Sequence, residues 1–522
     1  MTRARWYRRC TAQGMPASLK ASALSAALAI PRPSALSAAL AISAALVICG
    51  ACATNPVTGK KQVSLLSEAE EQAIGQQQDA EIRREMGIYA DRGLEQYVNE
   101  IGQEIARHSH RPNLAWTFTI VDSPAINAFA LPGGYVYVTR GILAYLDDES
   151  ELAGVLGHEI GHVTARHAAQ AYTRQAEANI GLQILSIFVP GTRPFADLGA
   201  TGLSVLFLRN GREAELEADR LGVEYGSVAG YDPAGVPRFL STLARVAALS
   251  DRGIPNWLST HPDPGARVSK AAPVAGKFVS ADAKKINRDQ YLDRIRGIEF
   301  GDSPKDGIVR GNEFVHPLLR IGVSFPDGWE LTNGASAVVA QEPGTKHFMV
   351  LQEVEQAPLL RQGSGAQGGR TIAEAAVEAM RKAGYTVVDG TMQNINGNQA
   401  HVGVYRGTAK DVGKVVMRAA HIAVGRQMYV VAGFAPETEF DVVDRDFKPA
   451  LQTFRQLSQQ EAANIKPNRL EFYTVQKGDS WQSIAVRQGG SIVNAATLAI
   501  MNDREVSAQP QPGDRVKIII GG

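Results

Sequence analysis

The stretch that decides the fold runs from Glu151 to His167 and reads ELAGVLGHEIGHVTARH. It contains the pattern H-E-x-x-H and no proline, and its apolar residues recur at a spacing that predicts an α-helix. These apolar residues are Leu152, Val155, Leu156, Ile160 and Val163. Because residues four apart lie on one face of a helix, His158 and His162 can both aim a ring nitrogen at one metal ion.

The acid inside the pattern, Glu159, has a different task from the histidines. It lies one residue after His158, which is about 100° around the helix, so it can hold a water molecule beside the metal without being a third ligand in line. Imidazole nitrogens suit Zn²⁺. The pattern therefore predicts a zinc site with Glu159 as general base. The alternative is a surface helix with two ordinary histidines, since a five-residue pattern also arises by chance.

A catalytic zinc site needs a third protein ligand and one open position. The next helix-forming run is REAELEADRLG at residues 212–222. H-E-x-x-H followed by E-x-x-A-D resembles the HtpX and CAAX prenyl protease family of zinc metallopeptidases, which are gluzincins. The resemblance implies that Glu215 is the third ligand of one Zn²⁺ per chain and that Asp219 orients a ligand imidazole. The remaining acids are expected on a solvated helix face: Glu213, Glu217 and Glu224.

The segment before the metal helix, AINAFALPGGYVYVTR at residues 125–140, resembles the edge strand and turn of the same family. Alternating residues from Tyr135 to Thr139 predict a strand. By resemblance this strand pairs with extended substrate, and Asn127 lies near the substrate backbone.

A histidine after the third ligand offers a further site residue. THPDPGAR at residues 260–267 resembles the H-P…R element of the family. His261 would then hydrogen-bond the oxyanion of the reaction, or fill the open zinc position and close the site. A plain loop histidine is the third alternative.

The first 52 residues have the features of a secretory leader: basic first, apolar next, small residues last. Gly50-Ala51-Cys52 resembles a bacterial lipobox, which implies that Cys52 is lipidated and anchors the chain to a membrane. The implied location is periplasmic, on the outer membrane of a Gram-negative bacterium. The alternative is a soluble exported protein cleaved nearby. All three cysteines lie in this leader, so no disulfide is expected beyond it.

An apolar stretch at residues 180–208 is interrupted by PGTRP at 190–194. Each arm is shorter than the roughly 20 residues that a membrane-spanning helix needs. The stretch therefore predicts a helical hairpin that covers the cleft or touches lipid, or else a buried helix pair.

The 522 residues are too many for one ordinary core, and we expect an α+β multidomain protein. The predicted mainly helical peptidase domain, with a small edge-stranded sheet, covers residues 53–300. Residues 310–457 faintly resemble the PsbP-like α+β fold and are expected to bind or dock. Residues 470–522, in the order βααβ, resemble a LysM module, which implies binding to peptidoglycan. A net charge of +1 without a basic patch argues against nucleic acid.

The family resemblance implies a zinc metalloendopeptidase of the cell envelope that cleaves misfolded or stalled outer-membrane proteins. The alternative is a non-catalytic envelope chaperone or adaptor that binds proteins and peptidoglycan. Glu159 argues against this alternative because a structural zinc site needs no base. A glycan hydrolase lacks an assignable pair of acids.

Overall fold

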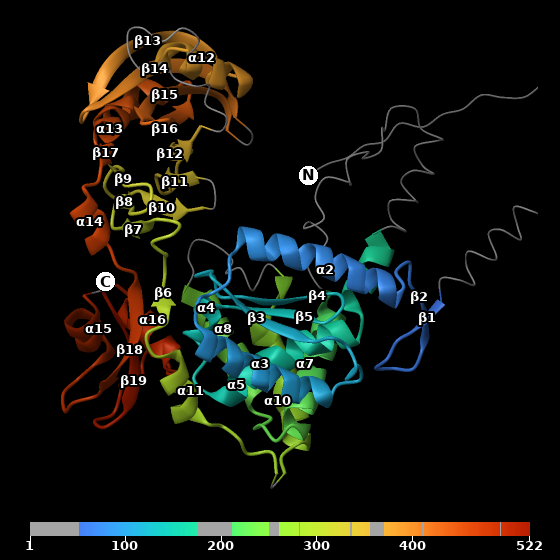
Figure 1. Cartoon of the computed structure of the whole chain (residues 1–522). Coiled ribbons are helices and arrows are strands. Elements are labelled where there is room, and N and C mark those ends of the chain that lie inside the picture. Colours follow the sequence, from blue (N-terminus) through green and yellow to red (C-terminus); the bar gives the residue numbers. More distant parts are fainter. Residues whose placement is uncertain are drawn as a thin grey trace, which may run out of the picture. The chain divides into compact units, whose positions relative to one another are not determined.

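The computed structural model describes residues 52–522 apart from 176–210, 250–259, 281, 335–336, 355–369, 410–411 and 491. The chain divides into two compact units, Met1–Cys52 and Ala53–Gly522, and the second is described below (Figure 1). The helical hairpin predicted at 180–208 lies outside the described residues. Within the described part, no helix is both long and apolar enough to cross a membrane.

The second unit begins with short strands and two helices: β1 (Cys52–Thr54), β2 (Lys61–Val63), α2 (Glu68–Glu85) and α3 (Arg92–Arg107). A capping box starts α2, because the Ser67 side chain accepts from the Glu70 backbone N–H while the Glu70 carboxylate accepts from the Ser67 N–H at 2.8 Å. Asp91 caps α3, and α3 buries one apolar face in the core of the site-bearing domain.

A three-stranded sheet lies beside the site, with β3 (Thr117–Val121), β5 (Tyr135–Thr139) and β4 (Ala128–Leu131) in that order. The strand predicted at residues 135–139 is confirmed. However, it is the central strand, paired with β3 in parallel and with β4 antiparallel. Residues 135–139 therefore have no free edge to pair with substrate, and the outer strands of the sheet are β3 and β4, of which β4 lies in the same segment 125–140. Residue alternation reveals a strand but not its place in a sheet.

The turn between β4 and β5 explains this arrangement. Gly133 and Gly134 have φ values of 89° and 102°, which side chains other than glycine rarely adopt. The turn folds β4 back along β5, and α2 lies beside β4 (Figure 1).

The H-E-x-x-H motif lies on α5 (Glu149–Thr164), after the short α4 (Arg140–Leu143), and every residue of α5 is buried. Its main partner is α7 (Arg212–Val228). The two helices meet at glycines, since a Cβ on Gly157 would lie 3.0 Å from the Gly222 Cα and one on Gly222 would lie 2.9 Å from the His158 backbone nitrogen. This close approach brings acids on α7 to the histidines on α5.

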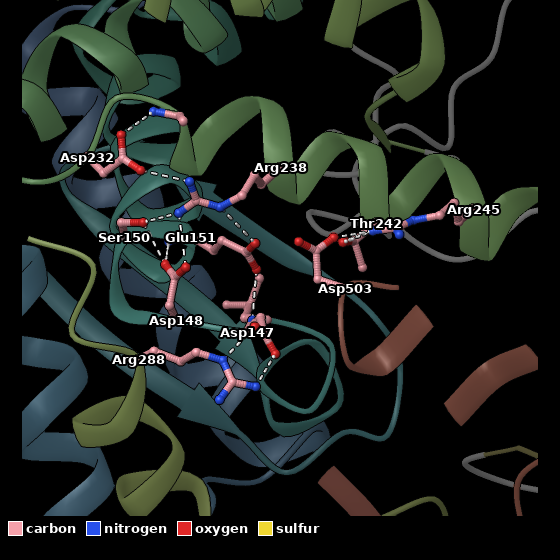
Figure 2. Close-up of polar contacts among 12 residues, drawn as sticks. Asp147, Asp148, Ser150, Glu151, Asp232, Arg238, Thr242, Arg245, Arg288 and Asp503 are labelled. Atoms are coloured by element: carbon pink, nitrogen blue, oxygen red, sulfur yellow. Dashed lines mark hydrogen bonds and ion pairs between the residues drawn. The ribbon is translucent and has the colours of Figure 1, made fainter. Parts of the chain in front are cut away.

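A network of charges fixes the start of α5 (Figure 2). Asp148 caps the helix by accepting from the Glu151 backbone N–H at 3.0 Å. Arg238 reaches in from α8 (Gly235–Leu249) and lies 2.9 Å from Asp148 and 2.7 Å from Asp232. Two further helices follow, α10 (Pro264–Lys277) and α11 (Arg288–Ile295), and Arg288 at the start of α11 pairs with Asp147 at 2.9 Å.

Residues 308–457 form two antiparallel sheets around a separate hydrophobic core. The larger sheet has the order β10-β11-β12-β16-β15-β14-β13 and the smaller one the order β17-β9-β8-β7. The strands are β7 (Ile308–Arg310), β8 (Glu313–His316), β9 (Ile321–Ser324), β10 (Glu330–Asn333), β11 (Ala337–Gln341), β12 (Phe348–Glu353), β13 (Thr386–Ile395), β14 (Asn398–Ala409), β15 (Gly413–Val424), β16 (Gln427–Pro436) and β17 (Arg455–Gln456). The helices are α12 (Ile372–Lys382), α13 (Phe440–Gln452) and α14 (Gln459–Asn464).

The C-terminal segment has the predicted βααβ order: β18 (Asn468–Thr474), α15 (Trp481–Gly489), α16 (Ala495–Met501) and β19 (Arg515–Ile520). Its sheet also takes in β6 (Glu299–Phe300), which pairs with β18. Its apolar residues share one core with α3, α5 and α11. Lys517 is fully buried there and donates from Nζ to the Leu146 carbonyl oxygen at 2.6 Å, just before α5.

Candidate metal centre

Four side chains from three segments converge in the interior: His158 and His162 on α5, Glu215 on α7, and His261 just before α10. All four are buried, and one ligand atom from each lies within 4.8 Å of the others. The Nε2 atoms of His158 and His162 are 3.0 Å apart. Glu215 oxygens lie 3.6 Å from His158 Nε2 and 3.4 Å from His162 Nε2. The structure thus brings together the three ligands predicted from the sequence.

The chemistry of this donor set fits a zinc ion. Two imidazole nitrogens and one carboxylate are a usual set for catalytic Zn²⁺. Burial alone would raise the pKa of Glu215, but His261 beside it and hydrogen bonds with His158 and His162 hold that pKa well below its usual range. The carboxylate is therefore ionised and ready to bind a cation.

Glu159 lies next to the cluster and is 1% exposed. Its Oε1 is 3.6 Å from His261 Nε2. Burial raises the pKa of Glu159 above its ordinary value, and a carboxylate with a raised pKa is better matched to taking up and releasing a proton near neutral pH. The position and the environment both suit a general base.

His261 points into the cluster rather than out of a loop. Its Nδ1 lies 3.1 Å from both Glu215 oxygens and 3.3 Å from His158 Nε2, and the residue is 2% exposed. The structure therefore places an imidazole nitrogen where a fourth ligand would stand. Among the sequence-based alternatives, this geometry argues against a plain loop histidine.

Two residues fix the orientation of the ligands from behind. Asp219 Oδ1 lies 3.0 Å from His158 Nδ1, the ring atom that faces away from the cluster. Arg267 binds both Asp219 oxygens, at 2.8 and 2.6 Å, and its third nitrogen lies 2.7 Å from Glu215. Asp219 occupies the place expected of it, and Arg267, which the sequence motif contained without a role, joins Asp219 to Glu215.

A cleft contains residues of both the cluster and β4. Its lining includes Phe129, Ala130, Leu131 and Pro132 from β4 and the turn after it, together with Glu159, His162 and His261. Asn127 precedes β4, and its backbone N–H donates to the Thr139 hydroxyl at 3.2 Å. Among the described residues that line the cleft, Asn127 does not occur, so a contact with substrate stays a prediction.

Sequence reasoning missed one pair of residues at the site. Glu217 was expected on a solvated face, but its Oε2 lies 3.2 Å from His167 Nε2, and His167 Nδ1 lies 2.8 Å from His162 Nδ1. The solvated-face expectation is wrong for Glu217 because α7 packs on α5 and leaves this side chain only 27% exposed. The sequence signal that could have revealed this pair was a third histidine five residues after His162.

Cys52 is the first described residue, and its lipidation stays a prediction.

Comparisons with known proteins point to the same chemistry. Residues 93–274 match the model of peptidase family M48. The chain is 33% identical over 311 residues to the beta-barrel assembly-enhancing protease of Escherichia coli O157:H7, which covers 58% of this chain and 60% of that protein. It is 30% identical over 244 residues to the mitochondrial metalloendopeptidase OMA1 of Schizosaccharomyces pombe, covering 45% of this chain and 69% of that protein. The chain thus spans less than two thirds of the first relative's length.

Among solved structures, the solution structure of cyanobacterial PsbP from Synechocystis matches 28% of this chain and 95% of its own, at 13% identity and a TM-score of 0.22. At this TM-score the match does not establish the fold of residues 310–457. The PsbP-like fold and the LysM-like module stay predictions.

Proposed function

This chain belongs to peptidase family M48, and on that premise we propose that it is a zinc-dependent metalloendopeptidase. The observation that carries the proposal is the convergence of His158, His162 and Glu215 beside the buried Glu159. A structural zinc site needs no base beside its ligands. The carboxylate one helical step from the ligands is what hydrolysis requires.

Each residue of the site has its own role in the proposed reaction. When bound, Zn²⁺ polarises the scissile carbonyl and lowers the pKa of water toward about 7. Glu159 takes the proton from the attacking water and passes it to the leaving amine. Asp219 and Arg267 hold His158 and Glu215 in place, so the ligand atoms need no rearrangement during the reaction.

The proposed substrate is an extended protein segment. The free edge of β4 beside the cleft can add a substrate strand through main-chain hydrogen bonds, which grips peptide regardless of its sequence. Such binding suits unfolded or misassembled proteins. The name of the Escherichia coli relative refers to β-barrel assembly, and we place the substrates of this chain among envelope proteins of the same kind.

His261 regulates access to the metal in this proposal. With His261 Nδ1 in the ligand cluster, four protein ligands would surround the ion and leave no position for water. In this arrangement the histidine must move aside before the reaction. Closure by His261 is the alternative that its short distances to Glu215 and His158 favour.

Two further proposals concern the location. We infer that Cys52 carries lipid and anchors the mature chain to the outer membrane on its periplasmic side, and that residues 470–522 bind peptidoglycan. Incorporation of labelled palmitate that is lost in Cys52→Ala tests the first. Co-sedimentation of the mature chain with purified peptidoglycan tests the second.

Cleavage of unfolded casein tests the enzymatic proposal, with the mature chain prepared without its lipid-bearing Cys52 (residues 53–522). Wild type and Glu159→Gln are compared after their zinc content has been measured, with Glu213→Gln as a control because Glu213 is an exposed acid on α7. We expect zinc in all three proteins and cleavage by wild type and the control only. Equal cleavage by Glu159→Gln that a chelator does not stop would contradict the mechanism.

A further inference from the structure

A second imidazole stands behind the ligand His162. The His162 ring presents Nε2 to the cluster and Nδ1 to His167 Nδ1, 2.8 Å away. On its other side, His167 Nε2 lies 3.2 Å from Glu217 Oε2. Both histidines are buried, and Glu217 comes from α7, the helix that also carries Glu215.

These distances allow one arrangement of protons among neutral rings. A histidine that binds a metal through Nε2 carries its proton on Nδ1. His162 therefore donates from Nδ1, and His167 must accept at its own Nδ1. A neutral imidazole that accepts at Nδ1 donates from Nε2, and Nε2 of His167 faces a carboxylate oxygen, which can only accept. The three groups form a chain of donors and acceptors with no conflict.

The backbone is bent to bring His167 to this place. Arg166, just after α5, has φ of 61°, a left-handed conformation that costs free energy in a residue with a side chain. Its guanidinium binds Glu71 at 2.8 Å and the Leu66 carbonyl oxygen at 2.7 Å, which holds the bend. Without this reversal the chain would continue the helix and carry His167 around its axis, away from His162.

We propose that His167 and Glu217 form a positioning relay that fixes the tautomer and ring orientation of His162 and strengthens its binding to zinc. The proposal rests on the proposed zinc site. In this arrangement both ligand histidines are oriented by a carboxylate on the side of the ring that faces away from the cluster. His158 meets Asp219 directly at 3.0 Å, whereas His162 reaches Glu217 through a second ring.

Zinc affinity, measured by competition with a chromophoric chelator, tests the relay in the mature chain. His167→Phe keeps a ring of similar size but removes the acceptor, and we expect roughly 10- to 100-fold weaker zinc binding, the usual effect of losing a group that orients a metal ligand. Glu217→Gln keeps a side chain of the same shape but loses the charge, and we expect a smaller loss. Glu213→Gln should bind zinc as wild type does.

A readout of the tautomer separates positioning from general stability. In ¹⁵N-histidine spectra of the zinc-loaded protein, the His162 Nδ1–H and the His167 Nε2–H should both be protonated sites, and Glu217→Gln should shift the His167 signal. Thermal unfolding of the same variants identifies any that fail to fold. Glu217→Gln, which changes only a partly buried carboxylate at the end of the relay, still tests the proposal if His167→Phe unfolds.

The results also distinguish this proposal from the zinc site itself. If His167→Phe and Glu217→Gln bind zinc as tightly as Glu213→Gln while His158→Ala loses zinc, the relay is overturned and the zinc site stands. If His158→Ala also keeps zinc with wild-type affinity, the proposed function fails as well. Weakened binding in both relay variants, with folding intact, supports the relay.

Discussion

The guanidinium of Arg267 binds both carboxylate oxygens of Asp219, through Nε at 2.8 Å and a terminal nitrogen at 2.6 Å. The other terminal nitrogen lies 2.7 Å from Glu215, so one cation neutralises two buried acids. Burial would raise the pKa of Asp219, but the hydrogen bonds with Arg267 and His158 hold that pKa below its usual value. The buried acids can stay ionised in the metal-free protein because this arginine is present.

Removal of the guanidinium should destabilise the metal-free protein. In Arg267→Met, Asp219 and Glu215 lose their buried counter-charge, and breaking a buried pair of this kind costs about 3–5 kcal/mol. Thermal unfolding of the metal-free mature chain measures this loss. Arg212→Met is the control, since its ion pair with Asp263 is exposed and should contribute little. Equal unfolding temperatures for the two variants would mean that Arg267 does not stabilise the site.

Replacement of His261 should show whether this residue blocks the metal site or donates a hydrogen bond to the oxyanion. If His261 blocks the metal, His261→Ala opens a position for water and should cleave casein faster than wild type while still binding zinc through three ligands. If the histidine instead donates to the oxyanion, the same variant should lose roughly 100-fold or more in kcat. The initial rate of casein cleavage, normalised to zinc content, decides between them, and a lower rate would overturn the closure that we favour.

Lys517 links the C-terminal segment to the start of the metal helix. Its buried Nζ donates to the Leu146 carbonyl oxygen and lies 3.6 Å from Asp147. Lys517→Met should leave that carbonyl unsatisfied and remove a counter-charge, which costs about 2–4 kcal/mol. Thermal unfolding of the mature chain measures the effect, with the exposed Lys477→Met as control. A wild-type unfolding temperature in Lys517→Met would show that this contact contributes nothing to stability.

Residues 310–457 should lose stability in acid because of His421. Burial, with a smaller effect of His401 opposite it on β14, lowers the pKa of His421 from 6.5 to about 3. The unfolded chain therefore takes up the proton first, so stability falls as the pH drops below about 6.5 and is unaffected above it. At pH 5 the loss is about 2 kcal/mol.

Hydrogen exchange of the β15 amides, corrected for the intrinsic effect of pH on exchange, measures this loss between pH 7.5 and pH 5. His421→Leu should remove most of the dependence. The same substitution at His347, which lies near the surface between Glu342 and Glu439, serves as control. The same loss of protection in His421→Leu as in wild type would assign the acid sensitivity to other groups.

The sequence predicted the parts of the site that depend on one helix. His158, Glu159 and His162 share a turn of α5, so their spacing alone places them. Glu215 and Asp219 came from a family motif, because no local pattern tells which of several acids on α7 will meet α5. That choice depends on the helix contact at Gly157 and Gly222, which is a tertiary feature.

The features that the sequence did not predict also depend on tertiary contacts. The order of strands in the sheet depends on pairing between segments, so alternation at Tyr135–Thr139 could not show that β4 takes the edge. Glu217 looked like a surface acid because its partner, His167, lies on another helix. The burial of Lys517 runs against the usual exposure of lysine, and only the packed fold explains it.

The most direct test of the zinc site is the metal content of Glu215→Ala against Glu213→Ala, two substitutions of the same acid two residues apart on α7. After dialysis against a weak chelator, wild type and Glu213→Ala should keep about one zinc ion per chain, and Glu215→Ala should lose most of it because the buried cluster loses its carboxylate ligand and keeps only neutral imidazoles. A full zinc ion retained by correctly folded Glu215→Ala would contradict the account.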